Sequence, residues 1–503
     1  MAWTARIGSR TTFSVACHMK RTFSSTTDAR LAVLEHAAKG VFKPLSRTAP
    51  VFYTQGSRVM PLFEPSDFYK ELKKRILSAK DNIFLATLYI GQSEKELVGT
   101  IRTALENSDT LKVHILVDCL RGTRASQSQS SATLLLPLIR DFPAGRVQVS
   151  MYHTPDLKGI LKKALPQRFN ESIGLMHLKV YGFDDAVMLS GANLSTDYFT
   201  NRQDRYIVFD QQPELAKYYH NLINLVGSFS YQLGLPQPTQ EPYSLTMPSS
   251  MPDPVCQSTQ FKAKVRSRLE NFIADAMTET KKNDSEDDTA VLPVIQMGPF
   301  GIRQDEKMTL ELLEIVHRQG KSKDSWWTIH LTSGYFNFTD RYKAFILRTQ
   351  ARFQFITASP EANGFFNSRG VSRFLPPAYT HIERQFYRQV TRANKQDVIS
   401  IEEYKRPGWT YHAKGLWVCL ANQVWPSVTM IGSPNFGHRS SNRDLEAQAV
   451  VITKSKELQE SLHKEVNRLH EYSSAVSSET FKKQDRRVPY GVKLATAMVK
   501  TML

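Results

Sequence analysis

The chain has 503 residues, of which 41% are hydrophobic and 22% charged, so it can bury one large core or two ordinary ones. This balance indicates a globular enzyme. The formal net charge of +17 favours an anionic partner. This partner could be nucleic acid, phospholipid headgroups or a phosphorylated small molecule.

The cysteines and the hydropathy pattern exclude two further classes. No stretch approaches the roughly 18 apolar residues that a membrane-spanning helix needs, so we expect any membrane association to be peripheral. The four cysteines are far apart and lack a C-x-x-C spacing, which argues against a disulfide framework and a zinc site; they are Cys17, Cys119, Cys256 and Cys419.

Residues 1–27 are basic and rich in hydroxyl side chains, and the first acidic residue is Asp28. Transit peptides form a positive amphipathic helix and avoid carboxylates. The segment therefore predicts a mitochondrial transit peptide, and the alternative is a disordered basic tail.

Residues 28–235 alternate between helical and strand patterns. Helices are predicted over 65–82, 95–108 and 132–142, and buried strands over 83–90, 111–118, 146–154, 177–184 and 186–193. Strands that alternate with helices predict a sheet covered by helices on both faces. We expect this region to be the first of two halves.

Residues 236–256 are rich in proline and serine and predict an extended linker. Beyond it, residues 257–503 repeat the earlier order of elements, with strands expected over 326–336, 353–359, 397–404, 412–420, 427–435 and 445–453. A polar tract near 279–289 interrupts this second half as a surface insertion. Two halves with one order of elements indicate an internal duplication.

Each half carries a histidine and a lysine two residues apart. Alternate side chains of a strand share a face, so His177 lies beside Lys179, and His412 beside Lys414. A histidine can attack phosphorus or protonate a leaving oxygen, and a lysine can hold non-bridging oxygens. Because the pair occurs twice, it predicts a phosphate site better than surface decoration.

A small-residue turn follows each pair and ends in an asparagine. "SGAN" ends at Asn193 and "GSPN" at Asn435; we expect the backbone at Gly191, Gly432 and Ser433 to approach a phosphate closely. An acid lies eleven positions after each asparagine: Asp204 (204 − 193) and Glu446 (446 − 435). A carboxylate that binds one imidazole nitrogen fixes the tautomer and raises the basicity of the other.

These motifs resemble the signature of the phospholipase D superfamily, His-x-Lys-x4-Asp followed by Gly-Ser-x-Asn, present once in each half. The first copy includes Asp184, and the second has Cys419 at that position. The resemblance implies an α/β fold of two tandem phospholipase D-like α/β/α sandwich domains, related by pseudo-two-fold symmetry, with the active site at their interface.

The stretches around both sites are most similar to the branch of the superfamily that makes phosphatidylglycerophosphate. The resemblance implies that one histidine, by analogy His177, attacks CDP-diacylglycerol and expels CMP, leaving a phosphohistidine. His412 would protonate CMP and then deprotonate glycerol 3-phosphate. The resemblance also implies that the lysines and asparagines hold the phosphate and that Asp204 and Glu446 orient the rings. Because two lysines already neutralise the phosphodiester, we expect no metal or cofactor to take part.

Several arginines near the motifs are candidates for binding the substrates' phosphates, with generic basic surface as the alternative; they are Arg202, Arg205, Arg439, Arg443, Arg121 and Arg124. Two basic and apolar segments, residues 155–169 and 486–503, are candidates for contact with an anionic membrane. The predicted location is the matrix side of the inner mitochondrial membrane. The main rival is a phosphodiesterase or nuclease of the same fold, although we expect no nucleic acid partner.

Overall fold

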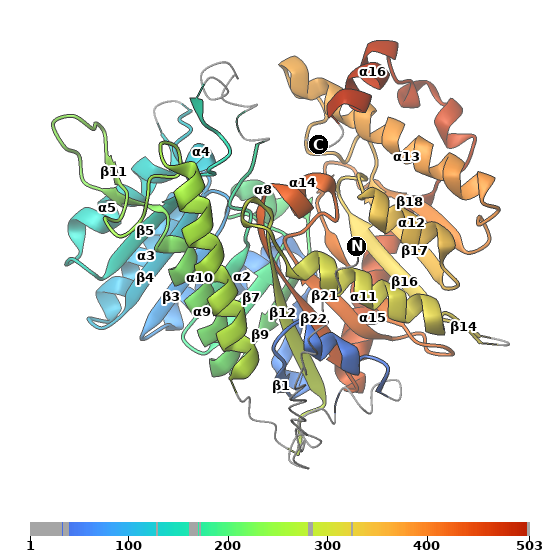
Figure 1. The fold of residues 1–503 in the computed structure, drawn as a ribbon, viewed down its shortest axis with the longest axis horizontal. Coiled ribbons are helices and arrows are strands. Elements are labelled where there is room, and N and C mark those ends of the chain that lie inside the picture. Colours follow the sequence, from blue (N-terminus) through green and yellow to red (C-terminus); the bar gives the residue numbers. More distant parts are fainter. Residues whose placement is uncertain are drawn as a thin grey trace, which may run out of the picture.

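The computed structural model describes residues 33, 40–126, 129–159, 170, 173–279, 285–322 and 325–499. It consists of two large sheets that meet in the middle of the molecule and are covered by helices (Figure 1). The predicted transit peptide and residues 160–169 of the first membrane candidate lie outside the described residues.

The first sheet is built from the N-terminal half in the order β11-β10-β5-β4-β3-β6-β7-β9-β2. Its strands are β2 (Val59–Leu62), β3 (Asn82–Ala86), β4 (Lys112–Asp118), β5 (Val147–Tyr152), β6 (Val180–Phe183), β7 (Ala186–Ser190), β9 (Tyr206–Phe209), β10 (Tyr231–Gly234) and β11 (Ser244–Thr246).

The second sheet has the order β1-β12-β22-β21-β20-β16-β17-β18-β23, with β13 paired to β12. Its strands are β1 (Phe52–Thr54), β12 (Thr289–Met297), β13 (Ile302–Arg303), β16 (Thr328–Ser333), β17 (Arg352–Ala358), β18 (Ile399–Tyr404), β20 (Lys414–Cys419), β21 (Pro426–Gly432), β22 (Leu445–Thr453) and β23 (Ser473–Ala475). Two small ribbons complete the strands, β14 (Lys321–Ser322) with β15 (Ser325–Trp326) and β8 (Arg202–Gln203) with β19 (Thr410–Tyr411).

The two sheets repeat one topology. In the first, β3, β4 and β5 are parallel, and β6, β7 and β9 continue from β3 as an antiparallel meander. In the second, β16, β17 and β18 are parallel, and β20, β21 and β22 continue in the same way. The predicted duplication and the α/β class are therefore confirmed.

The helices cover the sheets through apolar faces. In α2, Phe68, Leu72 and Ile76 recur at a spacing of four residues and are buried. The helices are α2 (Pro65–Ser78), α3 (Lys95–Asn107), α4 (Cys119–Gly122), α5 (Ser131–Asp141), α8 (Thr196–Thr200), α9 (Pro213–Gly227), α10 (Ser258–Thr278), α11 (Gln304–Gln319), α12 (Asp340–Arg348), α13 (Leu375–Arg392), α14 (His438–Asn442), α15 (Lys456–Glu471) and α16 (Tyr490–Val499). Among the described residues, none of these helices has the length and apolarity to cross a bilayer.

One apolar core joins the halves. It contains Leu189 and Ile207 of the first sheet together with Ala447 and Val451 of the second. Burial of apolar surface contributes about 25 cal/mol per Å², so this shared core holds the two sheets together along β7, β9, β21 and β22. The two His-x-Lys motifs and the asparagine turns next to these strands are thereby held in fixed positions relative to each other.

Two segments differ from the sequence-based boundaries. Residues 52–54, assigned above to the first half, form β1 and pair with β12 of the second sheet. Within the expected linker, β11 folds back on β10 as a hairpin of the first sheet, because pairing satisfies backbone groups that an extended linker would leave to water. The predicted domain limits otherwise remain a proposal.

Candidate active site

His177 lies at the junction of the two halves, just before β6. The preceding residue, Met176, forms a parallel bridge with Leu445 of β22, and the His177 backbone N–H donates to the Leu445 carbonyl at 2.8 Å. This pairing sets the imidazole beside the next residue of β22. His177 Nδ1 lies 2.9 Å from Glu446 Oε2, and both groups are buried.

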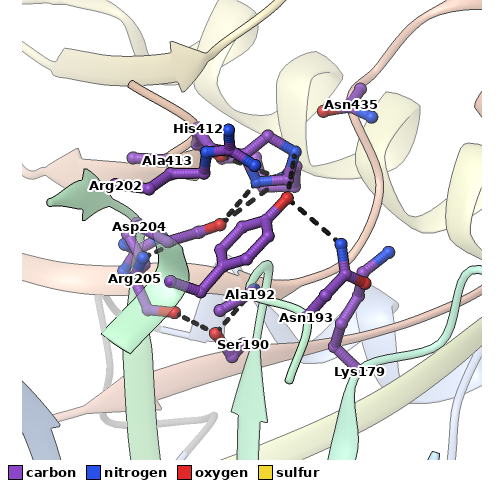
Figure 2. Close-up of polar contacts among 12 residues, drawn as sticks. Lys179, Ser190, Ala192, Asn193, Arg202, Asp204, Arg205, His412, Ala413 and Asn435 are labelled. Atoms are coloured by element: carbon purple, nitrogen blue, oxygen red, sulfur yellow. Dashed lines mark hydrogen bonds and ion pairs between the residues drawn. The ribbon is translucent and has the colours of Figure 1, made fainter. Parts of the chain in front are cut away.

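His412 occupies the equivalent place in the other half, between β19 and β20. Strand β19 pairs in parallel with β8, and the His412 backbone N–H donates to the Gln203 carbonyl at 2.8 Å. The residue after Gln203 is Asp204, whose Oδ2 lies 2.6 Å from His412 Nδ1. Figure 2 shows the Asp204 carboxylate directed at the His412 ring.

Each imidazole is therefore held by a carboxylate from the opposite half. The first-half histidine binds the second-half glutamate, and the second-half histidine binds the first-half aspartate. A carboxylate beside Nδ1 favours the tautomer with a proton on Nδ1, which leaves the Nε2 lone pair for chemistry. At His412, Lys414 Nζ also lies 2.7 Å from Nδ1. Neither half can build an oriented histidine alone.

Both histidines are neutral in the free site. Burial, together with the Lys179 charge, lowers the pKa of His177 well below the ordinary value of 6.5. Burial and the Lys414 charge do the same to the pKa of His412, to which His177 itself also contributes. These shifts favour the neutral form of each ring, which acts as a nucleophile or base rather than as a cation.

The two lysines point into the same buried region. Lys179 Nζ donates to the His177 carbonyl and Lys414 Nζ to the His412 carbonyl, each at 2.8 Å, and both side chains are almost fully buried. Burial lowers the pKa of each ammonium. Cations in such a dry environment bind phosphate oxygens strongly, because little water competes.

The asparagines of the two turns face this region from opposite halves (Figure 2). Asn193 Nδ2 donates to the Tyr198 hydroxyl at 3.1 Å. The side-chain oxygens of Asn193 and Asn435 are buried and have no hydrogen-bond partner. Buried amides with spare bonding capacity at the mouth of a histidine pair are suited to a polar ligand.

The glycines of the two turns lie where a side chain would not fit. A Cβ on Gly191 would lie 2.4 Å from Asp204 Oδ1 and 2.8 Å from Lys414 Nζ. A Cβ on Gly432 would lie 2.3 Å from the Ala447 carbonyl, to which Ser433 Oγ donates at 3.3 Å. These residues make room for the acids and for β22, and a contact of their backbone with substrate stays a prediction.

Sequence analysis missed two tyrosines that enclose His412. Its ring packs edge-on against Tyr198, with centroids 5.2 Å apart, and against Tyr335 at 5.8 Å. The Tyr198 hydroxyl lies 3.4 Å from His412 Nε2. Tyr198 follows Asn193 by five residues, whereas Ser440 holds that place after Asn435 (440 − 435 = 5) and donates to Glu446. Comparing the two copies position by position would have marked this asymmetry.

Comparison with known proteins places this geometry in a family. A family model described as "Cardiolipin synthase, PLD-like domain" matches residues 72–225. The mitochondrial CDP-diacylglycerol–glycerol-3-phosphate 3-phosphatidyltransferase of Gallus gallus is 42% identical over 494 residues, which cover 91% of this chain and 86% of the relative. The human protein of the same name is 40% identical, covering 91% and 85%. The chain belongs to this phosphatidyltransferase family.

A solved structure has the same fold as this chain. Phosphatidylserine synthase from Haemophilus influenzae Rd KW20 superimposes with a TM-score of 0.69 over 92% of this chain and 99% of that chain, at 18% identity. At that identity the likeness concerns the fold, which is the phospholipase D-like α/β fold expected from the motifs.

Asp184 of the family signature lies away from the histidines. It sits at the turn after β6 with φ of 51°, and its carboxylate accepts the backbone N–H groups of Lys80, Asp81 and Asn82 at 2.8 to 2.9 Å. The expectation of a catalytic role is therefore corrected to a structural one. Cys419 ends β20 at the equivalent turn, where its Sγ donates to the Val424 carbonyl at 3.3 Å, so the second copy lacks an acid without loss to the site.

Arg205 is likewise structural. It is 1% exposed, forms two 2.9 Å bonds with the Glu465 carboxylate, and lies over the Trp417 ring. Its Nη1 donates to the Met430 carbonyl at 2.6 Å. All these partners belong to the second half, so this guanidinium ties the halves together and does not bind substrate.

We expect Arg205→Met to lower the free energy of unfolding by about 3 to 5 kcal/mol, because Glu465 is left as a buried unpaired charge. Urea unfolding followed by tryptophan fluorescence measures this. The double variant Arg205→Met/Glu465→Leu is the matched control and should regain most of the loss, since it removes both charges. Equal destabilisation of both variants would contradict the buried pair.

Two of the remaining candidate arginines lie beside the catalytic histidines. Arg202 donates to Thr410 Oγ1 at 3.0 Å and its charge lowers the pKa of His412. Arg439 binds Asp444 at 3.1 Å and its charge lowers the pKa of His177. These two border the site, one from each half.

Three others stay candidates. Arg121 lies over the Tyr89 ring at 4.3 Å, and the Arg124 carbonyl accepts from Gln92; both belong to the first half near α4. Arg443 is fixed by its backbone, whose N–H donates to the Arg439 carbonyl at 2.8 Å. A role for these three in substrate binding remains a prediction.

One group in the described residues has the spacing of metal ligands: His177, Asp444 and Glu446. The donor atoms are already bonded within the protein. Asp444 accepts from the Leu175 backbone N–H and from Arg439, and Glu446 accepts from Ser440 and His177. This donor set fits a histidine-orienting network better than a resident cation.

Proposed function

We propose that this protein transfers the phosphatidyl group of CDP-diacylglycerol to glycerol 3-phosphate, giving phosphatidylglycerophosphate and CMP. The proposal rests on one observation above all: two neutral buried imidazoles, each oriented by a carboxylate of the other half, lie in a chain that is about 40% identical to transferases of that name.

The first displacement uses His177 as nucleophile. Its Nε2 attacks the phosphorus next to diacylglycerol, the P–O bond to CMP breaks, and His412 gives a proton to the departing CMP oxygen. His412 is neutral in the free site, but the negative charge of the bound diphosphate raises its proton affinity. Lys179 and Lys414 hold the non-bridging oxygens throughout.

The second displacement runs the same steps with a new acceptor. His412 takes the proton of a glycerol 3-phosphate hydroxyl, the resulting oxygen attacks phosphorus, and the P–N bond to His177 breaks. Tyr198 and Tyr335 crowd the His412 ring, which limits the access of water as a competing nucleophile. Arg202 and Arg439 supply positive charge for the second phosphate of the acceptor.

Acceptor competition tests the function. The purified protein is given CDP-diacylglycerol with glycerol 3-phosphate, serine or water alone, with and without EDTA, and the lipid product is identified. Phosphatidylglycerophosphate formed only with glycerol 3-phosphate, at a rate unaffected by EDTA, is expected. Turnover of single-stranded DNA at a rate comparable with CMP release would instead support the rival nuclease.

The acidic limb of the pH profile follows from the lowered histidine pKa values. Because the nucleophile must be neutral and its pKa lies below 6.5, protonation of His177 should lower kcat/KM only below about pH 6.5, whereas loss of the proton that His412 delivers sets the alkaline limb. Arg439→Gln removes a cation that lowers the pKa of His177, so its acidic limb should move to higher pH. An acidic limb of the wild-type kcat/KM profile centred above pH 6.5 would contradict this assignment.

We place the reaction at the matrix face of the inner mitochondrial membrane, where the protein would bind peripherally. The support is that the relatives are named mitochondrial and that the leader composition favours import. Fractionation with protease protection of isolated mitochondria and mitoplasts tests this location. Digestion of the protein in mitoplasts with intact inner membranes would exclude it.

A further inference from the structure

Exposed apolar side chains gather at one corner of the molecule. The described residues expose nine large apolar side chains, and five of them lie in two short segments, residues 366–374 and 490–494. The five are Phe366, Val371, Phe374, Tyr490 and Leu494. Scattered single apolar residues are normal on a protein surface, whereas a group of this kind marks a contact site.

The two segments are parts of one surface because α16 packs on α13, which begins where the first segment ends. In α16, Val492 and Thr496 are buried, while Tyr490 is 82% and Leu494 59% exposed. The helix thus presents large apolar groups away from the protein. Figure 1 shows α13 and α16 in the upper part of the view, on the same side as α8 and α14, which follow the two catalytic turns.

The same corner is strongly basic. No acidic residue lies between Glu361 and Glu383, or after Asp485. Burial and the charges of Lys493, Arg384 and Arg388 lower the pKa of His381, so these cations lie together on α13 and α16. Exposed apolar groups beside a group of cations are complementary to an anionic bilayer.

A cavity of about 370 Å³ opens within this corner, between the first segment, the start of α13 and residues 485–487. Arg373, Arg486 and Arg487 line it, with Asp485 as the one acid. Arg486 is 6% exposed and pairs with Glu403, Glu361 and Asp485, yet its Nε is buried without a partner. The Ser368 hydroxyl is also buried without a partner. Unpartnered buried donors in a cationic cavity suit a phosphate.

The surface also adjoins the catalytic residues. Phe365 packs on Tyr335 with ring centroids 6.1 Å apart, and Tyr335 packs on His412. The next residue, Phe366, is 46% exposed on the corner. A lipid drawn from a bilayer seated here would have a short path to the histidines.

We propose that residues 366–374 and 486–494 form a docking surface for an anionic phospholipid bilayer, in which Arg373, Arg486 and Arg487 hold the phosphate of a lipid headgroup while the apolar side chains enter the interface. The docking surface goes beyond the proposed function and rests on it only for the direction in which the lipid substrate travels.

Vesicle flotation of the full chain tests the docking surface. The protein should bind vesicles of phosphatidylcholine with phosphatidylglycerol, and bind phosphatidylcholine vesicles much more weakly. Phe366→Ser/Leu494→Ser should weaken binding about tenfold or more, and Arg373→Gln/Arg487→Gln about fivefold for each charge removed. The matched controls, Leu77→Ser/Val424→Ser and Arg266→Gln/Arg318→Gln, alter equally exposed side chains elsewhere and should bind as the wild type does.

Activity separates this proposal from the function. On CDP-diacylglycerol dispersed in detergent micelles the docking variants should keep the wild-type rate, because none of the changed residues touches the histidines. Absence of transfer by the wild type itself, with the binding pattern intact, would overturn the function alone. Unchanged vesicle binding by the docking variants, or a changed oligomeric state without a change in vesicle binding, would overturn the docking surface.

Discussion

Replacing either His177 or His412 by alanine is expected to lower kcat for phosphatidyl transfer by about 10⁴-fold or more. Each ring has a task that no neighbour can take over: one forms the bond to phosphorus, and the other moves the proton in both displacements. The two losses should not add in the double variant, because the residues act as one unit. CMP release from CDP-diacylglycerol measures all three rates.

The control for this experiment is His463→Ala, a histidine of α15 that bonds Asn467 at 2.9 Å and lies outside the site. It should keep the wild-type rate. Circular dichroism and the urea midpoint confirm that each variant is folded. Retention of more than about a tenth of the wild-type kcat by either catalytic variant would remove the two-histidine mechanism, since loss of a nucleophile costs far more.

Amidation of the crossed carboxylates should have the second-largest effect. Glu446→Gln and Asp204→Asn keep the shape of each side chain but offer a donor where the imidazole Nδ1–H needs an acceptor. The ring then favours the wrong tautomer. In a Ser-His-Asp triad the corresponding Asp→Asn change lowers kcat by about 10⁴-fold, and here we expect kcat to fall by about 10³- to 10⁴-fold. Asp141→Asn, an exposed acid paired with Arg102, is the control and should have no effect.

The two amidations should block different steps. Glu446 orients His177, so Glu446→Gln should suppress the initial burst of CMP. Asp204 orients His412, whose proton transfer both displacements need, so Asp204→Asn should slow the burst and turnover together. Rapid-quench kinetics separates these patterns. A normal burst of CMP in Glu446→Gln would contradict the role of Glu446 in orienting the nucleophile His177.

Much of this fold could be predicted from the sequence because its pattern is local. The buried strands are apolar runs bounded by turns, and α2 and α3 carry regular apolar faces, so their limits differ from expectation by only a few residues. The repeated His-x-Lys and asparagine turns mark both halves of the site. A twofold repeat is visible in sequence even when neither copy alone is informative.

The remainder depends on contacts between distant segments. The spacing of Asp204 and Glu446 from the asparagines predicts that each acid matters, but the ring it serves is set by the pairing of β8 with β19 and of Met176 with Leu445. The position of Asp184 in the signature motif likewise did not reveal that its carboxylate accepts backbone N–H groups at a turn.

The partner of the Arg205 guanidinium could not be predicted from the sequence for the same reason. It follows Asp204 directly, yet its side chain turns the other way and meets Glu465, 260 residues later. Adjacent residues on extended backbone point to opposite sides, so nearness in sequence to a catalytic acid did not imply nearness to the substrate.

Mapping of the covalent intermediate tests the crossed site most directly. The protein is mixed with radiolabelled CDP-diacylglycerol without acceptor, quenched in alkali, digested and sequenced by mass spectrometry. The account predicts one phosphatidylated histidine at His177, abundant in the wild type and nearly absent in Glu446→Gln. A modified His177 that persists in Glu446→Gln, or an adduct on any residue other than His177, His412 included, would contradict it.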